Sequence, residues 1–377
     1  MVKIAIVAGE TSGDNLGAGL IRELKLRLPD VQFEGIGGPA MQAEGMQSYF
    51  PMHKISIMGL DGLVRHLHEI LGIRRKLIQL FLNSPPDLFV GIDVPDFNLG
   101  LELKLRTSGI RTLHYVSPTV WAWRSYRIHK IRKAVGHMLT LFPFEADFYR
   151  DHNVPVTCVG HPIADQVSRE KVEPLLDSSG KPIVHPVIAL LPGSRRSEIE
   201  RLGPVFTQVA LRLIQQFNVH IVVPCANERV RPVLHETILK HLPEDRCTAI
   251  DGNARIALRG AKVALLASGT AALEAALVGT PMVVAYKVSL ASFVMVKVFS
   301  KVKHYSMPNH LLEQAPVPEF IQQQATADNL FNGVKYFLQN ESERLALREK
   351  LLGIQTSLQL NADISAAQAV LTELELP

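Results

Sequence analysis

The sequence of 377 residues is poor in cysteine and shows no arrangement of side chains suited to a metal ion. Its three cysteines, Cys158, Cys225 and Cys247, lie far apart and lack the spacing of metal ligands. We therefore expect neither disulfide bonds nor a zinc site. The sequence also offers no convincing acidic triad for a catalytic metal, so we expect no metal and no cofactor.

Long apolar runs are also missing. No stretch of 18 uncharged apolar residues occurs, which argues against a membrane-spanning helix. Near the N-terminus, a short strand-like segment ends at Glu10 without a cleavage site of small residues, so we expect no signal peptide. These two absences predict a cytoplasmic protein.

The common nucleotide-binding motifs are absent from the turn after the first predicted strand. Residues 8–14 read AGETSGD, without the lysine of a P-loop or the G-x-G-x-x-G of dinucleotide-binding folds. This argues against NTPase and nicotinamide chemistry. The turn exposes Glu10, Ser12 and Asp14 just before a helix, although Asp14 could simply cap that helix. No RNA-binding signature is present, and we expect no nucleic-acid partner.

Apolar strands alternate with amphipathic helices along the chain, which predicts an α/β fold of two Rossmann-like doubly wound domains facing across a cleft. The predicted helices include residues 15–28 and 99–106. We expect an N-terminal domain at 1–168, a linker at 169–186, a C-terminal domain at 187–345, and helices at 346–377 that pack across the junction. The predicted strands cover residues 2–8, 88–92, 112–116, 137–141, 187–191, 220–224, 248–250, 263–266 and 282–285.

Residues 267–284 combine a buried strand, a Ser-Gly-Thr turn, a helix and the next strand almost without spacers. The turn lets the backbone approach a ligand, and the positive end of the helix dipole favours a phosphate. Glu274 lies one turn further on, within reach of a ribose attached to that phosphate. The alternative is an ordinary capped helix with a solvated glutamate.

Residues 190–196, LLPGSRR, repeat this pattern of strand, Gly-Ser turn and helix. A guanidinium at such a turn can clamp a diphosphate and stabilise it as a leaving group, which makes Arg195 a candidate ligand. An exposed arginine without a role is the alternative.

The predicted strand at 88–92 delivers two carboxylates, Asp93 and Asp96, to the edge of the sheet just before a helix. Asp96 or Asn98 is well placed to cap that helix. Asp93 has no evident structural task, and a carboxylate there can act as a general base. Helix capping alone could also explain the pair.

Two segments have the composition of helices that lie on a membrane surface. One carries Leu63, Leu67, Leu71 and Ile78 at helical spacing, with basic residues between them, and the other covers 293–302. Packing of these stripes on the sheet is the alternative. Between residues 103 and 144 there are eight basic and no acidic residues, which indicates an anionic partner or a solvated basic helix. The aromatic and basic run at 121–127 favours a lipid surface.

Taken together, these motifs resemble the lipid-A-disaccharide synthases, inverting glycosyltransferases with the two-domain GT-B architecture. The resemblance extends over almost the whole chain, and the order of its motifs is highly specific. It rests on AGETSGD at 8–14, GID at 91–93, PDFN at 95–98, HYVSP at 114–118, VWAWR at 120–124, GH at 160–161, LLPGSR at 190–195, ASGTAALE at 267–274 and PN at 308–309.

The resemblance implies a reaction and a set of roles. UDP-2,3-diacylglucosamine would be joined to 2,3-diacylglucosamine 1-phosphate with release of UDP. Asp93 would be the base, and Glu10 would accompany it in the catalytic cleft. The implied UDP-sugar site is Gly193, Ser194, Arg195, Ser268, Gly269, Thr270, Ala271, Glu274 and Asn309. The implied acceptor side is Ser12, Asp96, Asn98, Trp123, Arg124 and His161.

The resemblance also implies partners. Both substrates carry acyl chains, so the protein would work on the cytoplasmic face of the inner membrane, and a homodimer is expected from the helical C-terminus. Lys287 departs from the family pattern, where an arginine is expected, and this puts a phosphate contact there in doubt. The alternatives are another GT-B enzyme acting on UDP-sugars, such as a UDP-GlcNAc epimerase or a peptidoglycan glycosyltransferase, and a non-catalytic module that binds nucleotide or lipid.

Overall fold

A computed structural model describes residues 1–55, 60–167, 174–252, 254–289, 293 and 303–376, and the side chains of these residues except 60–66. Contacts between residues divide the chain into two compact units. The first unit contains Met1–Asp165 together with Leu358–Pro377, and the second contains Gln166–Ser357. The chain therefore leaves the first unit once and returns to it at its end.

The first unit is built on a seven-stranded parallel sheet in the order β3-β2-β1-β4-β5-β6-β7. The strand order reverses between β1 and β4, and ligands of such sheets bind beyond the carboxyl ends of the strands at this switch point. The strands are β1 (Lys3–Ala8), β2 (Gln32–Ile36), β3 (Gln47–Ser48), β4 (Leu88–Ile92), β5 (Arg111–Tyr115), β6 (His137–Thr140) and β7 (Val156–Cys158).

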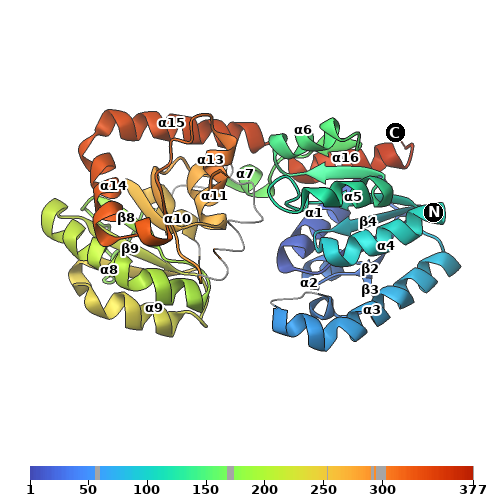
Figure 1. The fold of residues 1–377 in the computed structure, drawn as a ribbon, viewed down its shortest axis with the longest axis horizontal. Coiled ribbons are helices and arrows are strands. Elements are labelled where there is room, and N and C mark those ends of the chain that lie inside the picture. The colour runs from blue at the N-terminus through green and yellow to red at the C-terminus, as the bar shows by residue number, and fades with distance from the viewer. Residues whose placement is uncertain (56–59, 168–173, 253, 290–292, 294–302, 377) are drawn as a thin grey trace. The chain divides into compact units, whose positions relative to one another are not determined.

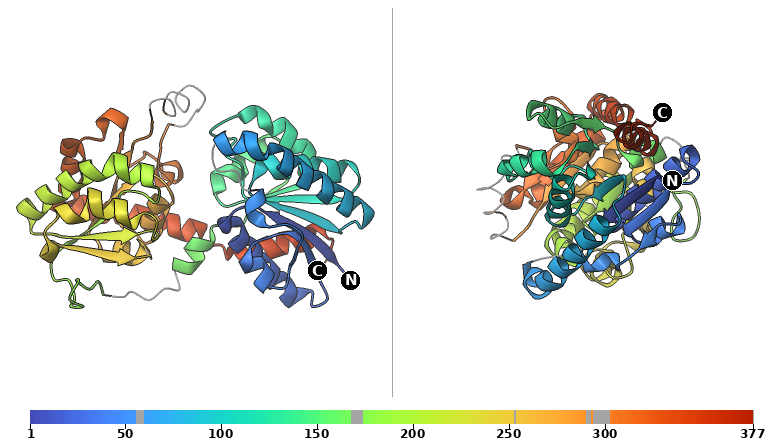
Figure 2. Two further views of the ribbon diagram at one scale, coloured as in Figure 1. Left: turned by 90° about the horizontal axis from the view of Figure 1, so that it is seen from below. Right: turned by 90° about the vertical axis from the view of Figure 1, so that its right-hand side faces the viewer.

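Helices cover both faces of this sheet (Figure 2). In β1, Ile4 and Ile6 pack with α1 and α16, whereas Ala5 and Val7 pack with α3 and α4 on the other face. Burial on both faces explains why the strand is almost continuously apolar. The helices are α1 (Thr11–Arg27), α2 (Pro39–Ala43), α3 (Leu60–Asn83), α4 (Pro95–Thr107), α5 (Ile128–Ala134), α6 (Pro143–Asp151), α7 (Pro162–Val167) and α16 (Ala362–Glu373).

The end of the chain completes the core of the first unit (Figure 1). Ala366, Ala367 and Val370 of α16 are fully buried in the same cluster as α1 and β1. The N-terminus of α16 is held by Asp165, whose carboxylate accepts hydrogen bonds from Asn361 N at 3.0 Å and Ala362 N at 2.7 Å. Asp165 thus caps α16, whose own N-cap residue, Asn361, makes no side-chain hydrogen bond to the helix.

The second unit contains a six-stranded parallel sheet in the order β10-β9-β8-β11-β12-β13, with its switch point between β8 and β11. Its strands are β8 (Val187–Leu191), β9 (His220–Cys225), β10 (Cys247–Asp251), β11 (Val263–Ala267), β12 (Met282–Tyr286) and β13 (Glu319–Ile321). Its helices are α8 (Arg196–Phe217), α9 (Arg231–Thr237), α10 (Ala254–Gly260), α11 (Thr270–Leu277), α13 (Met307–Leu311), α14 (Ala327–Gln339) and α15 (Glu341–Leu358).

The two doubly wound parallel sheets confirm the predicted fold class. Two predicted helices begin earlier than expected, since α1 starts at Thr11 and α4 at Pro95. Proline suits the first position of α4 because its fixed φ is helical and its missing N–H is not needed there. The strands β2, β3, β7 and β13 were not predicted, because they are short and only partly apolar. No helix in the described part of the chain is long and apolar enough to cross a membrane.

Candidate functional site

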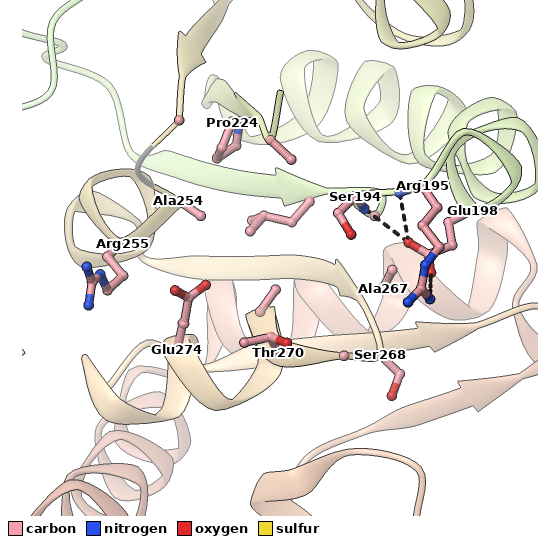
Figure 3. Close-up of a pocket in the computed structure, with 16 residues that line it drawn as sticks. Ser194, Arg195, Glu198, Pro224, Ala254, Arg255, Ala267, Ser268, Thr270 and Glu274 are labelled. Atoms are coloured by element: carbon pink, nitrogen blue, oxygen red, sulfur yellow. Dashed lines mark hydrogen bonds and ion pairs between the residues drawn. The ribbon is translucent and has the colours of Figure 1, made fainter. Parts of the chain in front are cut away.

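A pocket of about 630 Å³ opens at the switch point of the second sheet, between the ends of β8 and β11 (Figure 3). Two of its walls are the turns that the sequence singled out. The pocket is lined by Leu191, Gly193, Ser194, Arg195, Glu198, Pro224, Ala226, Gly252, Ala254, Arg255, Ala267, Ser268, Gly269, Thr270, Ala271 and Glu274. We call it the β8–β11 pocket.

Glu198 fixes the first wall of the β8–β11 pocket. Its Oε2 accepts hydrogen bonds from Ser194 N at 3.0 Å and Arg195 N at 3.2 Å, and its Oε1 lies 3.1 Å from Arg195 Nη1 (Figure 3). Gly193 has a φ of +128°, and a Cβ there would lie 2.5 Å from Glu198 Oε2. Glu198 already accepts from the backbone N–H groups of Ser194 and Arg195. An anion at this wall would therefore contact the Arg195 side chain, which is 75% exposed.

The second wall is the start of α11. Gly269, Thr270 and Ala271 line the pocket where the helix begins, and Glu274 lines it one turn further on (Figure 3). The positive dipole end and the N–H groups of a first helical turn favour a phosphate at this position. The Ser268 hydroxyl donates to the carbonyl of Tyr305. Arg195, which pairs with Glu198 at 3.1 Å, and the start of α11 are therefore the groups of the two walls that can contact an anion.

A third part of the pocket was missed by the sequence analysis. Pro224 and Ala226 lie at the end of β9, and Gly252, Ala254 and Arg255 follow β10. Both strands end at the same edge of the sheet as β8 and β11. The signal was present, because the strands at 220–224 and 248–250 were predicted and parallel strands place their carboxyl ends together.

Asn309, which the resemblance assigns to the UDP-sugar site, does not line the β8–β11 pocket. Its side chain is almost fully buried, with Nδ2 donating to Val317 O at 2.8 Å and to Glu319 Oε1 at 2.7 Å. Its Oδ1 accepts from Val317 N at 3.0 Å. Glu319 also accepts from Tyr305 N, whose carbonyl receives the Ser268 hydroxyl. Asn309 thus connects to the pocket wall through this chain of hydrogen bonds.

In the first unit, the switch point between β1 and β4 carries Asp93. Asp93 and Val94 form a turn in which both residues are left-handed, with φ values of 52° and 42°. Asp93 N donates to Tyr115 O at 2.9 Å, and the residue is half-buried. A Cβ on Gly9 would lie 2.7 Å from Val94, so the turn after β1 packs directly against the Asp93 turn. Glu10 and Ser12 are exposed beside that turn.

Three other polar residues of these turns have places that differ from the expected ones. Asp14 lies inside α1 and caps α2 instead, accepting from Gly38 N at 2.8 Å and Ala40 N at 2.9 Å. Asp96 is exposed and forms an ion pair with Arg127. Asn98 is completely buried within α4. The N-cap of α4 is Val94, without a side-chain hydrogen bond, so neither Asp96 nor Asn98 is its N-cap residue.

The remaining acceptor-side residues are Trp123, Arg124 and His161, of which His161 adjoins an aromatic cluster formed by Trp121, Phe142 and Phe144. The Arg124 guanidinium lies 5.1 Å from the ring centroid of the half-buried Trp123. The ring of His161 lies 5.7 Å from that of Phe142. Burial lowers the pKa of His161 to about 4, and its Nδ1 accepts from Ile163 N at 3.2 Å. His161 is therefore neutral at pH 7 and carries no charge for binding an anion.

Glu145 belongs to the same cluster. Its buried carboxylate accepts from Trp121 Nε1 at 3.2 Å and from Phe142 N at 3.4 Å. Burial raises the pKa of Glu145 to about 7. A raised pKa in the folded state means that this group favours folding at low pH, and that this contribution is lost as the pH rises through about 7.

We therefore expect the variant Glu145→Gln, which stays neutral, to gain stability relative to the parent protein as the pH rises from 4.5 to about 7, and to keep that gain at higher pH. The melting temperature of the first unit should shift by about 2–4 °C for each kcal/mol of change in the free energy of unfolding. Calorimetry of both proteins across this range measures the difference. The exposed Glu349→Gln is the control and should show a constant difference; a constant difference for Glu145→Gln would contradict the expectation.

The predicted membrane helix corresponds to α3, and only part of it faces outwards. Leu67 is 45% exposed and Leu71 is half-buried, whereas Ile78 packs against the core next to the sheet. Leu63 lies where the side chains are not described, and the second segment, 293–302, lies outside the described residues except for Phe293. The apolar stripe of α3 thus serves the core along much of its length.

Several residues of the basic stretch already have partners within the first unit. Arg111 pairs with Glu375 at 2.7 Å, Arg127 pairs with Asp96, and Arg106 donates to the carbonyl of Arg132 at 3.1 Å. The carboxylates of Glu375 and Asp96 therefore offset two of these positive charges, whereas Arg106 keeps its charge because a carbonyl is neutral. The exposed members include Lys104, Arg124, Lys130, Arg132 and Lys133.

Comparisons with solved structures support the fold. A glycosyltransferase of kitacinnamycin superposes with a TM-score of 0.64 at 15% identity, and each chain is 99% covered. UDP-GlcNAc 2-epimerase from Neisseria meningitidis, bound to UDP-GlcNAc, superposes with a TM-score of 0.62 at 11% identity over 100% of both chains. At these identities the likeness establishes the GT-B fold and nothing further.

Comparisons of sequence establish the family. Residues 4–372 match the family model described as lipid-A-disaccharide synthetase. The lipid-A-disaccharide synthase of Hahella chejuensis is 46% identical, covering 99% of this chain and 95% of its own. That of Azotobacter vinelandii is 47% identical over 98% of both chains. The resemblance drawn from the motifs is thereby confirmed, and the chain belongs to the lipid-A-disaccharide synthase family.

Proposed function

We propose that the protein joins UDP-2,3-diacylglucosamine to 2,3-diacylglucosamine 1-phosphate, giving a β(1→6)-linked lipid A disaccharide 1-phosphate and UDP. Membership of the family over nearly the whole chain is the observation that carries this assignment. The β8–β11 pocket supports it, because its walls offer a guanidinium and a helix start to a diphosphate and a carboxylate to a ribose. The reaction makes the protein an inverting glycosyltransferase.

In the proposed donor complex, the diphosphate of UDP lies between Arg195 and the first turn of α11, and Glu274 binds the ribose. The bond between the sugar C1 and the diphosphate oxygen breaks, and negative charge builds up on the departing UDP. Preorganised donors aimed at such a charge lower the barrier more than they strengthen ground-state binding. Arg195 and the dipole of α11 are the groups that support this role.

In the proposed acceptor complex, Asp93 takes the proton from the 6-hydroxyl of the acceptor as its oxygen attacks C1 from the face opposite UDP. Positive charge develops on the sugar ring in this oxocarbenium-like transition state. Asp93 suits the task because its carboxylate lies at a switch point, is half-buried, and accepts no hydrogen bond that would fix it elsewhere among the described residues. Glu10 lies exposed next to the same turn and would line the acceptor side.

Incubation of the protein with both lipid substrates tests the assignment. The expected products are UDP and a disaccharide lipid in equal amounts, measured by a coupled UDP assay and mass spectrometry. Absence of UDP release with both substrates present would sink the proposal. An epimerase of the same fold would instead convert the UDP-sugar without an acceptor, so a control without the acceptor separates the two activities.

We further propose that the protein docks through the outer side of α3 on the cytoplasmic face of the inner membrane. The acylated substrates reside in that membrane. Leu67 is exposed on α3, and Arg75 and Lys76 are exposed about two turns further along the same helix. Basic amphipathic helices of this kind insert their apolar side into the headgroup region. The exposed basic residues of α4 and α5 would add attraction to anionic lipid. A homodimer remains a prediction from the sequence.

The double variant Leu67→Ser/Leu71→Ser should bind anionic vesicles at least about fivefold more weakly, since removing a buried leucine side chain costs about 1.5–3 kcal/mol of transfer free energy. Co-sedimentation with vesicles measures the change. Leu345→Ser in α15 is a matched control, because Leu345 is 49% exposed and Leu67 is 45% exposed. Equal binding by the double variant and the control would show that α3 does not contact lipid.

A further inference from the structure

The backbone of the Asp93 turn has an unfavourable conformation, which neighbouring residues must stabilise. Asp93 and Val94 are consecutive residues with φ values of 52° and 42°, a region that non-glycine residues rarely occupy. The β-branched Val94 is especially unfavourable there. Such conformations persist only where the surroundings impose them, and they concentrate at functional sites.

The side chain of Asn98 donates hydrogen bonds to this turn and to β1. Asn98 is fully buried, and its Nδ2 donates to Asp93 O at 2.8 Å and to Val7 O at 3.2 Å. One amide thereby connects the Asp93 turn to the end of the neighbouring strand β1. The first backbone bonds of α4 act on the same turn, since Phe97 N and Asn98 N both donate to Val94 O.

A second buried pair supports Asn98. Glu102 lies one helical turn after Asn98, and its Oε1 lies 2.7 Å from Nδ1 of His114 on β5, with both side chains fully buried. A Cβ on Gly91 would lie 2.1 Å from Glu102 Oε1 and 3.0 Å from Asn98 Cβ. The absence of a side chain at Gly91 on β4 therefore leaves space for both side chains. The contact between Glu102 and His114 connects this face of α4 to β5.

We propose that Asn98 is a positioning residue, whose amide holds the Asp93–Val94 turn in its left-handed conformation and thereby aims the Asp93 carboxylate at the acceptor hydroxyl. This inference rests on the proposed role of Asp93 as the base. It replaces the expectation that Asn98 contacts the acceptor, because a fully buried amide reaches no substrate. The Glu102–His114 pair keeps Asn98 in register with the sheet.

The variants Asn98→Ala and Asn98→Leu test the proposal, the second keeping the branching and the number of heavy atoms of the side chain in case the first does not fold. Each should lower kcat by about 10- to 100-fold with little change in the KM of either substrate, because small displacements of a reacting group have effects of this size. Thr112→Val is the matched control, since it removes a buried hydrogen bond to Ala134 O from the same sheet. It should leave kcat within about twofold.

Adding Val94→Gly to either Asn98 variant should recover part of the lost kcat, because glycine adopts positive φ without steric cost. A purely structural role for Asn98 predicts no such recovery. The proposal is overturned if the Asn98 variants match Thr112→Val in kcat, if their loss lies in KM, or if Val94→Gly restores nothing. Should Asp93→Ala remain active, the base assignment fails and this inference with it; an inactive Asp93→Ala beside an active Asn98→Leu refutes this inference alone.

Discussion

Replacing Asp93 by asparagine should lower kcat for disaccharide formation by about 10²- to 10⁴-fold, the usual contribution of a general base. Asparagine keeps the size of the side chain and tolerates the left-handed conformation, so the φ of 52° at this position is preserved. The loss should therefore reflect chemistry and not misfolding. Steady-state measurement of UDP release with both lipid substrates gives kcat and both KM values.

Asp87→Asn is the control for this substitution. Asp87 lies at the opposite end of the same strand, where its carboxylate accepts from Lys3 N at 2.8 Å, far from the carboxyl end of β4. It should leave kcat within about twofold. Retention of more than about a tenth of the activity by Asp93→Asn would remove Asp93 from the role of base.

Arg195→Ala should lower kcat by about 10²- to 10³-fold, which is typical for loss of one group that stabilises transition-state charge. The turn itself should survive, because Glu198 still accepts from Ser194 N and Arg195 N after the side chain is removed. Arg195→Lys should recover only part of the rate, since an ammonium group cannot contact two phosphate oxygens in the bidentate manner of a guanidinium.

The adjacent Arg196 provides the matched control. Its side chain is 78% exposed, pairs with Glu200 at 2.7 Å and does not line the β8–β11 pocket. Arg196→Ala should change kcat by less than about twofold, because exposed ion pairs of this kind contribute little. Similar losses in the two alanine variants would mean that general positive charge, and not a specific contact with the diphosphate, explains the effect.

The turns that form two walls of the β8–β11 pocket could be predicted because each follows a buried strand directly. Strand, glycine-containing turn and helix at 190–196 and 267–274 are local patterns, and both lie on the walls of the β8–β11 pocket. The parallel sheets also follow from local patterns. What these segments have in common is that their conformation depends on neighbours in the sequence.

The positions of other polar side chains depend on partners outside their own helix. Asp14 was expected to cap its own helix, yet its carboxylate binds N–H groups 24 to 27 residues away. The amide of Asn309, which the resemblance assigns to the UDP-sugar site, binds Val317 and Glu319, which lie beyond the end of its helix α13. Polar side chains of this kind look alike in a sequence whether they bind a ligand or a distant backbone group, and only the fold decides between them.

The path of the chain through its two units has a consequence for synthesis. The ribosome releases residues 166–357, the entire second unit, before α16 emerges to bury Ala366 and Val370 in the core of the first. Domains fold largely in the order in which they become complete. The second unit can therefore fold first, whereas the core of the first unit is completed only once α16 has been synthesised.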